Sequence, residues 1–172
     1  IIKYGLPSGV QNSVIAIANL VVQTNINTFS STAVAGSGAY SKIEGFAFIP
    51  INAFAMGLST SVSQNLGARD YKRAKEAARF GILVCITLSE TIGILFYLFA
   101  PYAIGLFNQD PEVIAYGVRQ AHTEALFYCF LALSHSIAGV MRGAGKAIVP
   151  MCVMLGVWCI FRVSYITVAL SI

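Results

Sequence analysis

A basic segment between two long apolar runs is the feature that most constrains how this chain can fold. Residues 64–79 hold five of the eleven lysines and arginines, and apolar residues dominate the flanking runs at 33–66 and 80–100. The five basic residues are Arg69, Lys72, Arg73, Lys75 and Arg79. Cytoplasmic loops of membrane proteins carry an excess of Lys and Arg. The pattern therefore predicts two membrane-spanning helices that are joined on the cytoplasmic side.

The composition agrees with a membrane location. Of the 172 residues, 57% are hydrophobic and 10% are charged, with a mean hydropathy of +0.75. Soluble domains carry about a quarter charged residues, so this chain has too few to cover the surface of a soluble globule. Its net charge of +4 comes from basic residues that lie between apolar runs, without an aromatic and basic binding face. This arrangement argues against nucleic-acid binding.

Apolar runs of membrane length occur five times, which predicts an all-α membrane protein, a polytopic bundle of transmembrane helices. The expected spans are 5–29, 33–66, 80–100, 112–141 and 147–172. The shortest span gives roughly 31 Å of helix, which is enough to cross a bilayer. With the basic segment inside the cell, eight of the eleven basic residues fall on that side, as does the N-terminus. We expect a multi-pass protein of the plasma (inner) membrane with a cytoplasmic N-terminus.

Amide side chains recur along the first expected span. Asn12, Asn19, Gln23 and Asn27 follow one another at spacings of seven, four and four residues, which places them on one helical face. Lipid penalises such a polar stripe, so the stripe must face protein or water. It serves either interhelical hydrogen bonding or the wall of a hydrated substrate cavity. We take Asn19, Gln23 and Asn27 as candidate cavity-lining residues.

Three carboxylates lie within or beside the apolar runs. Charged groups at membrane depth are functional candidates by default. Glu44 in the second span is a further candidate for the cavity wall, while Lys42 is expected to extend to the membrane interface. Glu90 at the midpoint of the third span and Glu124 in the fourth are candidates for ion coupling or charge compensation. The alternative for Glu90 is a protonated, hydrogen-bonded glutamic acid without a role in transport.

Residues that perform catalysis or hold metal ions do not form a recognisable pattern. The four cysteines lie in apolar runs without a CxxC pair. Neither histidine is accompanied in the sequence by other residues at the spacing of a metal site. Paired aspartates, a Ser-His pair and a selectivity-filter motif are also absent from the sequence. Residues 142–146 lack the glycine and the Ser or Thr that a phosphate-binding P-loop requires. The sequence predicts neither an enzyme, nor a channel, nor a metal or cofactor site.

Several short motifs resemble the multidrug and toxic compound extrusion (MATE) family, and their order resembles the second half of such a transporter. The motifs are Gly5-Leu-Pro7 with Gln11, Gln23-Thr-Asn-Ile-Asn27, Val34-Ala35, Lys42-Ile43, Gln64-Asn-Leu-Gly-Ala68 followed by Ala74, Leu106-Phe107 with Asp110, and Arg142-Gly-Ala-Gly-Lys146 followed by Pro150. The motifs at residues 64–68 and 142–146, taken together, are fairly specific for this family. The resemblance covers essentially the whole chain.

The resemblance implies an exporter of twelve helices, in which two lobes of six helices surround a central cavity. Residues 1–172 would be a fragment, a partial C-terminal lobe that supplies helices seven to eleven. Its partners would be the missing N-terminal lobe of the same transporter, the lipid bilayer, and small cationic or amphipathic substrates. Such a secondary active antiporter exports drugs or metabolites in exchange for Na⁺ or H⁺ by alternating access and needs no cofactor beyond this coupling ion.

The chain departs from the family pattern at the ion site. Several branches use a carboxylate in the seventh helix and an aspartate in the tenth, but residues 5–29 and 125–141 contain no acid. Coupling would then depend on an acid in the first lobe, or on Glu44, Glu90 or Glu124 as substitutes. The alternative function is a lipid-linked oligosaccharide flippase of the same superfamily. A flippase would have more arginines at membrane depth than this chain, which offers mainly Lys42 and Arg162.

Overall fold

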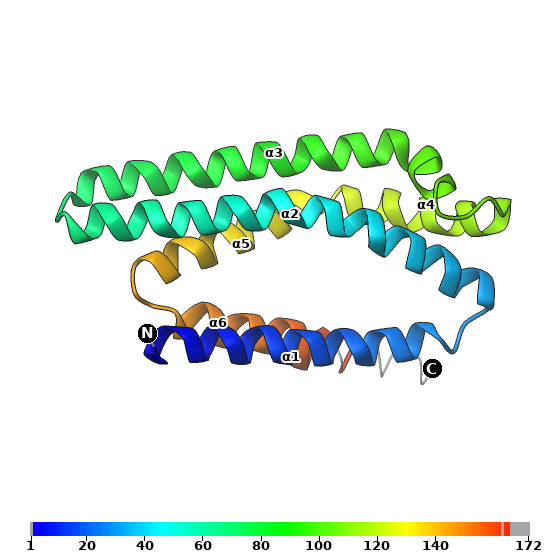
Figure 1. Cartoon of the computed structure of the whole chain (residues 1–172), viewed down its shortest axis with the longest axis horizontal. Coiled ribbons are helices and arrows are strands. Elements are labelled where there is room, and N and C mark those ends of the chain that lie inside the picture. The colour runs from blue at the N-terminus through cyan, green and yellow to red at the C-terminus, as the bar shows by residue number, and fades with distance from the viewer. Residues whose placement is uncertain (1, 163, 166–172) are drawn as a thin grey trace. The chain divides into compact units, whose positions relative to one another are not determined.

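The computed structural model describes residues 2–162 and 164–165, and these residues form helices joined by short connections (Figure 1). Within these ranges no β-strand occurs. The predicted all-α fold is therefore confirmed. The helices belong to two compact units, one made of Ile1–Phe29 with Gly145–Ile172 and the other of Ser30–Ala144.

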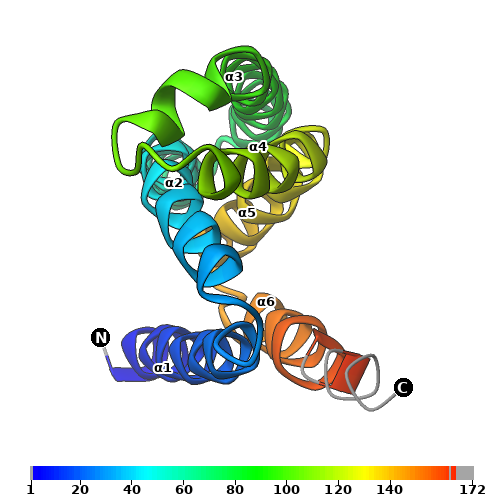
Figure 2. The same ribbon diagram turned by 90° about the vertical axis from the view of Figure 1, so that its right-hand side faces the viewer.

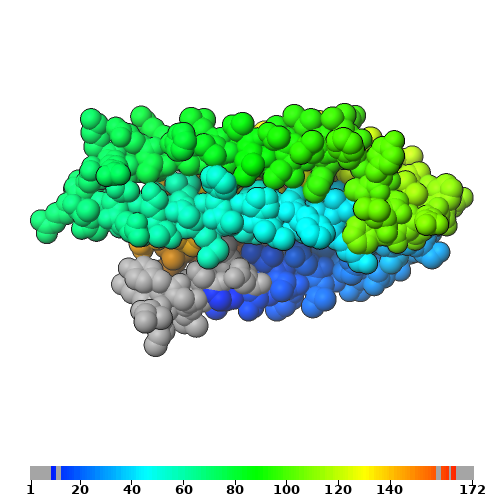
Figure 3. Space-filling view, turned by 45° about the horizontal axis from the view of Figure 1, so that its top comes forward, coloured from blue at the N-terminus to red at the C-terminus, as the bar shows by residue number. Residues whose placement is uncertain are grey.

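The second unit is a bundle of four helices. They are α2 (Ser31–Gly67), α3 (Tyr71–Gly105), α4 (Pro111–Ala125) and α5 (Tyr128–Gly143). The helices α2 and α3 lie side by side along their lengths (Figure 1, Figure 3), and α4 and α5 pack against both (Figure 2). Side chains from α2, α3 and α4 form the main buried cluster: Ala39, Tyr40, Ile43, Ala100, Ile104 and Ala121.

Two glycines allow close contact between helices of this bundle. A Cβ atom on Gly139 of α5 would lie 2.6 Å from the carbonyl oxygen of Ala55 on α2, and one on Gly93 of α3 would lie 2.8 Å from that of Ala125 on α4. Both distances are too short for a real side chain. Small residues permit this approach of backbones in membrane proteins, where packing rather than hydrophobic burial drives helix association.

The basic segment 64–79 is mostly helical and not the loop that the sequence suggested. Only residues 68–70 connect α2 to α3, with Arg69 in the left-handed region at a φ of 60°. The Asp70 carboxylate caps α3, because its Oδ1 accepts a hydrogen bond of 2.9 Å from the backbone N–H of Arg73. Ala, Lys, Arg and Glu favour helix, and Asp favours the N-cap. As a result, both flanking helices are longer than the expected spans 33–66 and 80–100.

The expected span 112–141 is divided into two helices. Between them lie Leu126 and Phe127, and the helix axis bends there by 54°. Neither residue is Pro or Gly, so the sequence offers no signal for the break. The backbone carbonyl of Tyr128, just past the break, accepts a hydrogen bond of 3.0 Å from the Ser89 hydroxyl of α3, and Gly93 lets α3 approach the end of α4. Tertiary contacts therefore stabilise the break.

The first unit contains α1 (Ile2–Ile26), α6 (Ile148–Met154) and a π-helical segment, η1 (Leu155–Phe161). The segment from α6 to η1 packs along α1 (Figure 2). Part of the expected span 147–172, at residues 163 and 166–172, lies outside the described residues.

Within the described residues, α2 and α3 are each long and apolar enough to cross a membrane, and α4 with α5 makes a third crossing if the bent pair is one span. The apolar stretches Ser13–Ile26 and Ile148–Val157 are shorter. The five expected crossings therefore stay a prediction.

Candidate functional site

The predicted amide residues of the first span are exposed within the part of the chain that the structure describes. Asn19 and Gln23 lie on α1, and Asn27 lies one residue beyond its end. The Gln23 side-chain amide donates a hydrogen bond of 3.1 Å to Oδ1 of Asn27. Side chains four residues apart are neighbours on a helix, so this bond places the two amides on one face. Nothing is described of the Gln11 and Asn12 side chains.

Arg162 joins this polar face. Its Nη1 donates a hydrogen bond of 3.0 Å to Oδ1 of Asn19, although the two residues come from opposite ends of the chain. From the sequence, Arg162 could be identified only as a cation at membrane depth. The spacing of residues within one span does not show which residue of another span Arg162 contacts. The only available signal was that a lone arginine in an apolar run requires a polar partner.

A second polar cluster lies inside the four-helix unit, where α4 meets α5. The Tyr40 hydroxyl donates to Oε2 of Glu124 over 3.2 Å, and the Gln120 amide donates to Oε1 of the same carboxylate over 2.9 Å. The hydroxyls of Tyr40 and Tyr128 are 3.1 Å apart. Because the single proton of Tyr40 goes to Glu124, Tyr128 must donate to Tyr40. Glu124 therefore accepts a hydrogen bond at each oxygen, at the end of a chain of buried donors.

Glu44 lies beside the same cluster. It follows Tyr40 by four residues on α2, which places the two side chains on one helical face, and it is half-buried. The structure thus brings Glu44 and Glu124 to one pair of tyrosines. The predicted place of Glu44 on the cavity wall, together with the amides of the first span, stays a prediction.

Glu90 has a different environment from the other two carboxylates. It is half-buried on α3, and its Oε2 atom is fully buried with no hydrogen-bond partner among the described residues. It lines a cavity of about 140 Å³ together with Tyr97 of the same helix and with Ala125 and Leu126 at the end of α4. A buried acceptor without a donor is unfavourable. Glu90 is therefore suited to interact with a ligand in this cavity.

His122 and Lys42 are each held by local contacts. The His122 ring stacks on Tyr97 with 4.0 Å between ring centroids, and its Nε2 lies 2.9 Å from the Tyr97 carbonyl oxygen. Lys42 is exposed, with its ammonium group 5.3 Å from the centre of the Phe107 ring, a cation–π distance. Among the described residues, no group of three or more His, Cys, Asp or Glu side chains could hold a metal ion.

Comparison with known proteins identifies the family. The MatE family model matches residues 7–166. The chain is 26% identical over 145 residues to the probable multidrug resistance protein YpnP of Bacillus subtilis, covering 84% of this chain and 33% of that protein. It is 24% identical over 159 residues to the probable multidrug resistance protein NorM of Thermotoga maritima, covering 92% and 34%.

The fold is also similar to that of a solved structure, a MOP superfamily transporter from Pyrococcus furiosus. The TM-score is 0.84 at 18% sequence identity, with 90% of this chain and 34% of that one covered. The chain therefore spans about a third of the length of the proteins that it matches. Because the family model matches nearly all of its residues, the chain belongs to the MatE family, whose members are membrane transporters and not enzymes.

Proposed function

We propose that this chain is part of the C-terminal lobe of a secondary active exporter. The transporter exchanges cationic or amphipathic drugs or metabolites for Na⁺ or H⁺ by alternating access, and the rest of it, including the N-terminal lobe, is the partner of this chain. The observation that carries the proposal is the family match over residues 7–166. The names of two relatives as probable multidrug resistance proteins support export of drugs.

We propose that the turn between α2 and α3 faces the cytoplasm, in the plasma (inner) membrane, with the N-terminus on the same side. Support comes from the distribution of charge. The first turns of α3 hold Lys72, Arg73, Lys75 and Arg79, and the end of α5 carries Arg142 with Lys146 just beyond it. The connection between α3 and α4 contains Asp110 and no basic residue. This asymmetry follows the positive-inside rule.

We propose that Asn19, Gln23 and Asn27 line the substrate cavity. Their exposure on and beside α1 supports this role. Amides both donate and accept hydrogen bonds, so they can bind varied amphipathic molecules without selecting one charge pattern. Arg162 adds a positive charge beside Asn19, to which it is hydrogen-bonded. Because this charge would repel a cationic substrate, Gln23 and Asn27 are the part of the face better suited to bind one.

We propose that Glu90 takes up the coupling ion and that Glu44 and Glu124 provide charge compensation. The unpartnered Oε2 atom of Glu90 and its adjoining cavity support the first role. The two hydrogen bonds to Glu124 support the second, because they already satisfy its carboxylate. The cavity also touches the end of α4, where the span is bent. A change in the charge of Glu90 can therefore alter the packing of the bend and link ion uptake to helix movement.

The proposed function is tested by efflux of a cationic dye from membrane vesicles that hold the complete transporter. A sodium gradient and a proton gradient are imposed separately, with empty vesicles as the control. We expect one of the two gradients to drive dye movement, which would also identify the coupling ion. If well-expressed protein responds to neither gradient, the antiporter proposal is wrong and the oligosaccharide flippase becomes the better hypothesis.

A further inference from the structure

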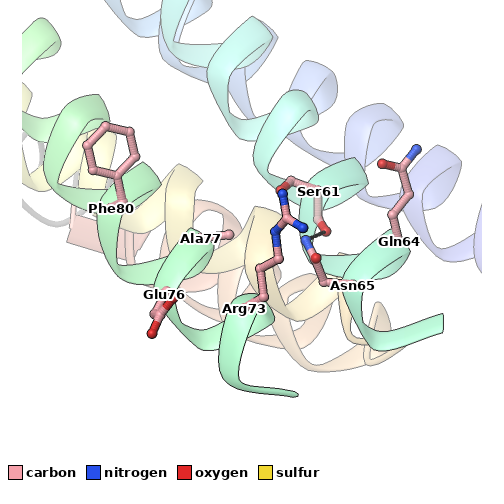
Figure 4. A pocket seen from close by; sticks show the side chains of 7 residues that line it. All are labelled: Ser61, Gln64, Asn65, Arg73, Glu76, Ala77 and Phe80. Atoms are coloured by element: carbon pink, nitrogen blue, oxygen red, sulfur yellow. Dashed lines mark hydrogen bonds between the residues drawn. The ribbon is translucent and has the colours of Figure 1, made fainter. Parts of the chain in front are cut away.

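A groove runs between α2 and α3 at the end of these helices where the basic residues gather. It consists of two adjoining cavities, of about 660 Å³ and about 480 Å³. Ser61 of α2 and Ala77 and Phe80 of α3 line both cavities, so the two form one continuous depression. Figure 4 shows the side chains around the larger one.

The two ends of this groove differ in chemistry. Toward the turn at residues 68–70, the additional lining residues are polar: Gln64, Asn65, Arg73 and Glu76. Away from the turn they are apolar: Ala53, Phe54, Gly57, Leu58 and Gly81. The polar end lies near the expected membrane surface, and the apolar end extends toward the middle of the spans. A membrane lipid has the matching arrangement, with a polar head group joined to an apolar tail.

Arg73 is the group that would recognise the head. Its side chain extends toward Ser61 and Asn65 of α2, while Glu76 points away from α2 (Figure 4). Among the described residues, the Arg73 guanidinium forms neither a salt bridge nor a side-chain hydrogen bond. Arginine binds phosphate through two parallel hydrogen bonds. The exposed Lys72 and Lys75 on the first turns of α3 add positive charge, which complements an anion despite the nearby Glu76.

The apolar end has the space that a hydrocarbon chain needs. A Cβ atom on Gly57 would have no neighbour within 4 Å, so the helix surface is open there. On the opposite side, Gly81 lets Leu58 pack directly against α3, where a Cβ atom would lie 2.5 Å from its Cδ1. Phe80 is 71% exposed and Phe54 is 39% exposed at the edges of the groove. Exposed apolar residues alone are common on membrane helices, but here they continue into a site with an unpaired cation.

We propose that the groove between α2 and α3 binds an anionic glycerophospholipid, with its phosphate at Arg73 and an acyl chain along Gly57. The proposal rests on the membrane orientation proposed above and not on the efflux activity. Basic residues at the cytoplasmic surface attract anionic lipids. A lipid bound here fixes the depth of the α2–α3 turn in the membrane and fills a seam between two helices of the lobe.

The test is native mass spectrometry of the complete transporter, purified and exchanged into either phosphatidylglycerol or phosphatidylcholine with the same acyl chains. We expect one additional phosphatidylglycerol molecule to stay bound to the unaltered protein. Arg73→Gln should weaken its binding by about tenfold, as expected for loss of a charged hydrogen bond. Arg79→Gln removes the same charge from the same helix outside the groove and should leave binding nearly unchanged. Gly57→Leu fills the apolar end and should reduce retention of both lipids.

Several outcomes would overturn the proposal. Equal losses in Arg73→Gln and Arg79→Gln would mean that only the general positive field attracts lipid. Equal retention of the two lipids would exclude recognition of the head group. Absence of any retained lipid would mean that the groove is empty or covered by another part of the transporter, and full retention in Gly57→Leu would place the acyl chain elsewhere.

The measurement uses no gradient and no drug, so its failure is distinguishable from failure of the efflux proposal. Each variant is first checked for a single symmetric peak in size-exclusion chromatography.

Discussion

At the scale of single residues, Oε2 of Glu90 is a buried side-chain oxygen without a hydrogen-bond partner among the described residues. We expect Glu90→Gln to abolish gradient-driven efflux, because the amide keeps the shape of the side chain but has no negative charge with which to bind a proton or neutralise Na⁺. The loss of a negative charge at a half-buried position should leave the melting temperature unchanged or higher. Dye efflux and thermal unfolding of the same purified variant measure the two effects.

The control for this prediction is Glu112→Gln, which makes the same chemical change at an exposed position in the first turn of α4. It should retain efflux. Full activity in Glu90→Gln would exclude Glu90 from coupling, and the ion site would then have to lie among Glu44, Glu124 or the other lobe.

Contacts within one helix could be predicted from the sequence, whereas contacts between helices could not. The spacing of Gln23 and Asn27 placed them on one face, and the structure joins them by a hydrogen bond. That prediction succeeded because both residues belong to one helix, where periodicity fixes direction. The pairing of Arg162 with Asn19 and that of Tyr40 with Glu124 were not predictable, because contacts between different helices depend on how each helix is rotated about its axis. The functional roles of these residues stay predictions.

At the scale of helices, the close contact between α5 and α2 depends on Gly139. We expect Gly139→Ala to lower the free energy of unfolding by about 1–3 kcal/mol, because the new methyl group would overlap the Ala55 carbonyl and force the helices apart. Thermal unfolding in detergent measures the change. Gly38→Ala on α2 is the matched control, since a Cβ atom there meets no neighbour within 4 Å. It should be neutral or stabilising, because Ala favours helix over Gly. Similar melting temperatures for both variants would contradict the prediction.

Helix boundaries followed the sequence where local chemistry sets them. The start of α4 at Pro111 lies one residue before the expected start of the span at residue 112, and Oδ1 of Asp110 accepts the backbone N–H of Glu112 at 2.9 Å. The bend after α4 was not predicted. It depends on the Ser89 hydroxyl and on the close approach of Gly93, which both belong to α3. The sequence thus predicted where this helix begins, whereas a break caused by a neighbouring helix required the structure.

At the scale of the whole molecule, the two compact units carry different polar chemistry. The unit that contains α1 presents amides and Arg162, and the four-helix unit contains Glu44, Glu90 and Glu124. This division agrees with the proposal that one set of residues contacts substrate and the other responds to the coupling ion. Under this proposal, a change in the amides alters which molecules are transported and how tightly they bind, while a change in Glu90 alters the response to the gradient.

The amide face provides a direct test of this division. We expect Gln23→Leu and Asn27→Leu to raise the KM for a cationic dye by about tenfold, the effect of losing one or two hydrogen bonds to substrate. Membrane expression and the preferred coupling ion should not change. Asn25→Leu is the matched control, because the Asn25 side chain donates to the Val21 carbonyl of its own helix over 3.0 Å and does not belong to the stripe. If the stripe variants lose expression as strongly as transport, the amides stabilise helix packing instead of lining the cavity. If Asn25→Leu raises the KM as much as they do, the effect belongs to α1 as a whole and not to one face.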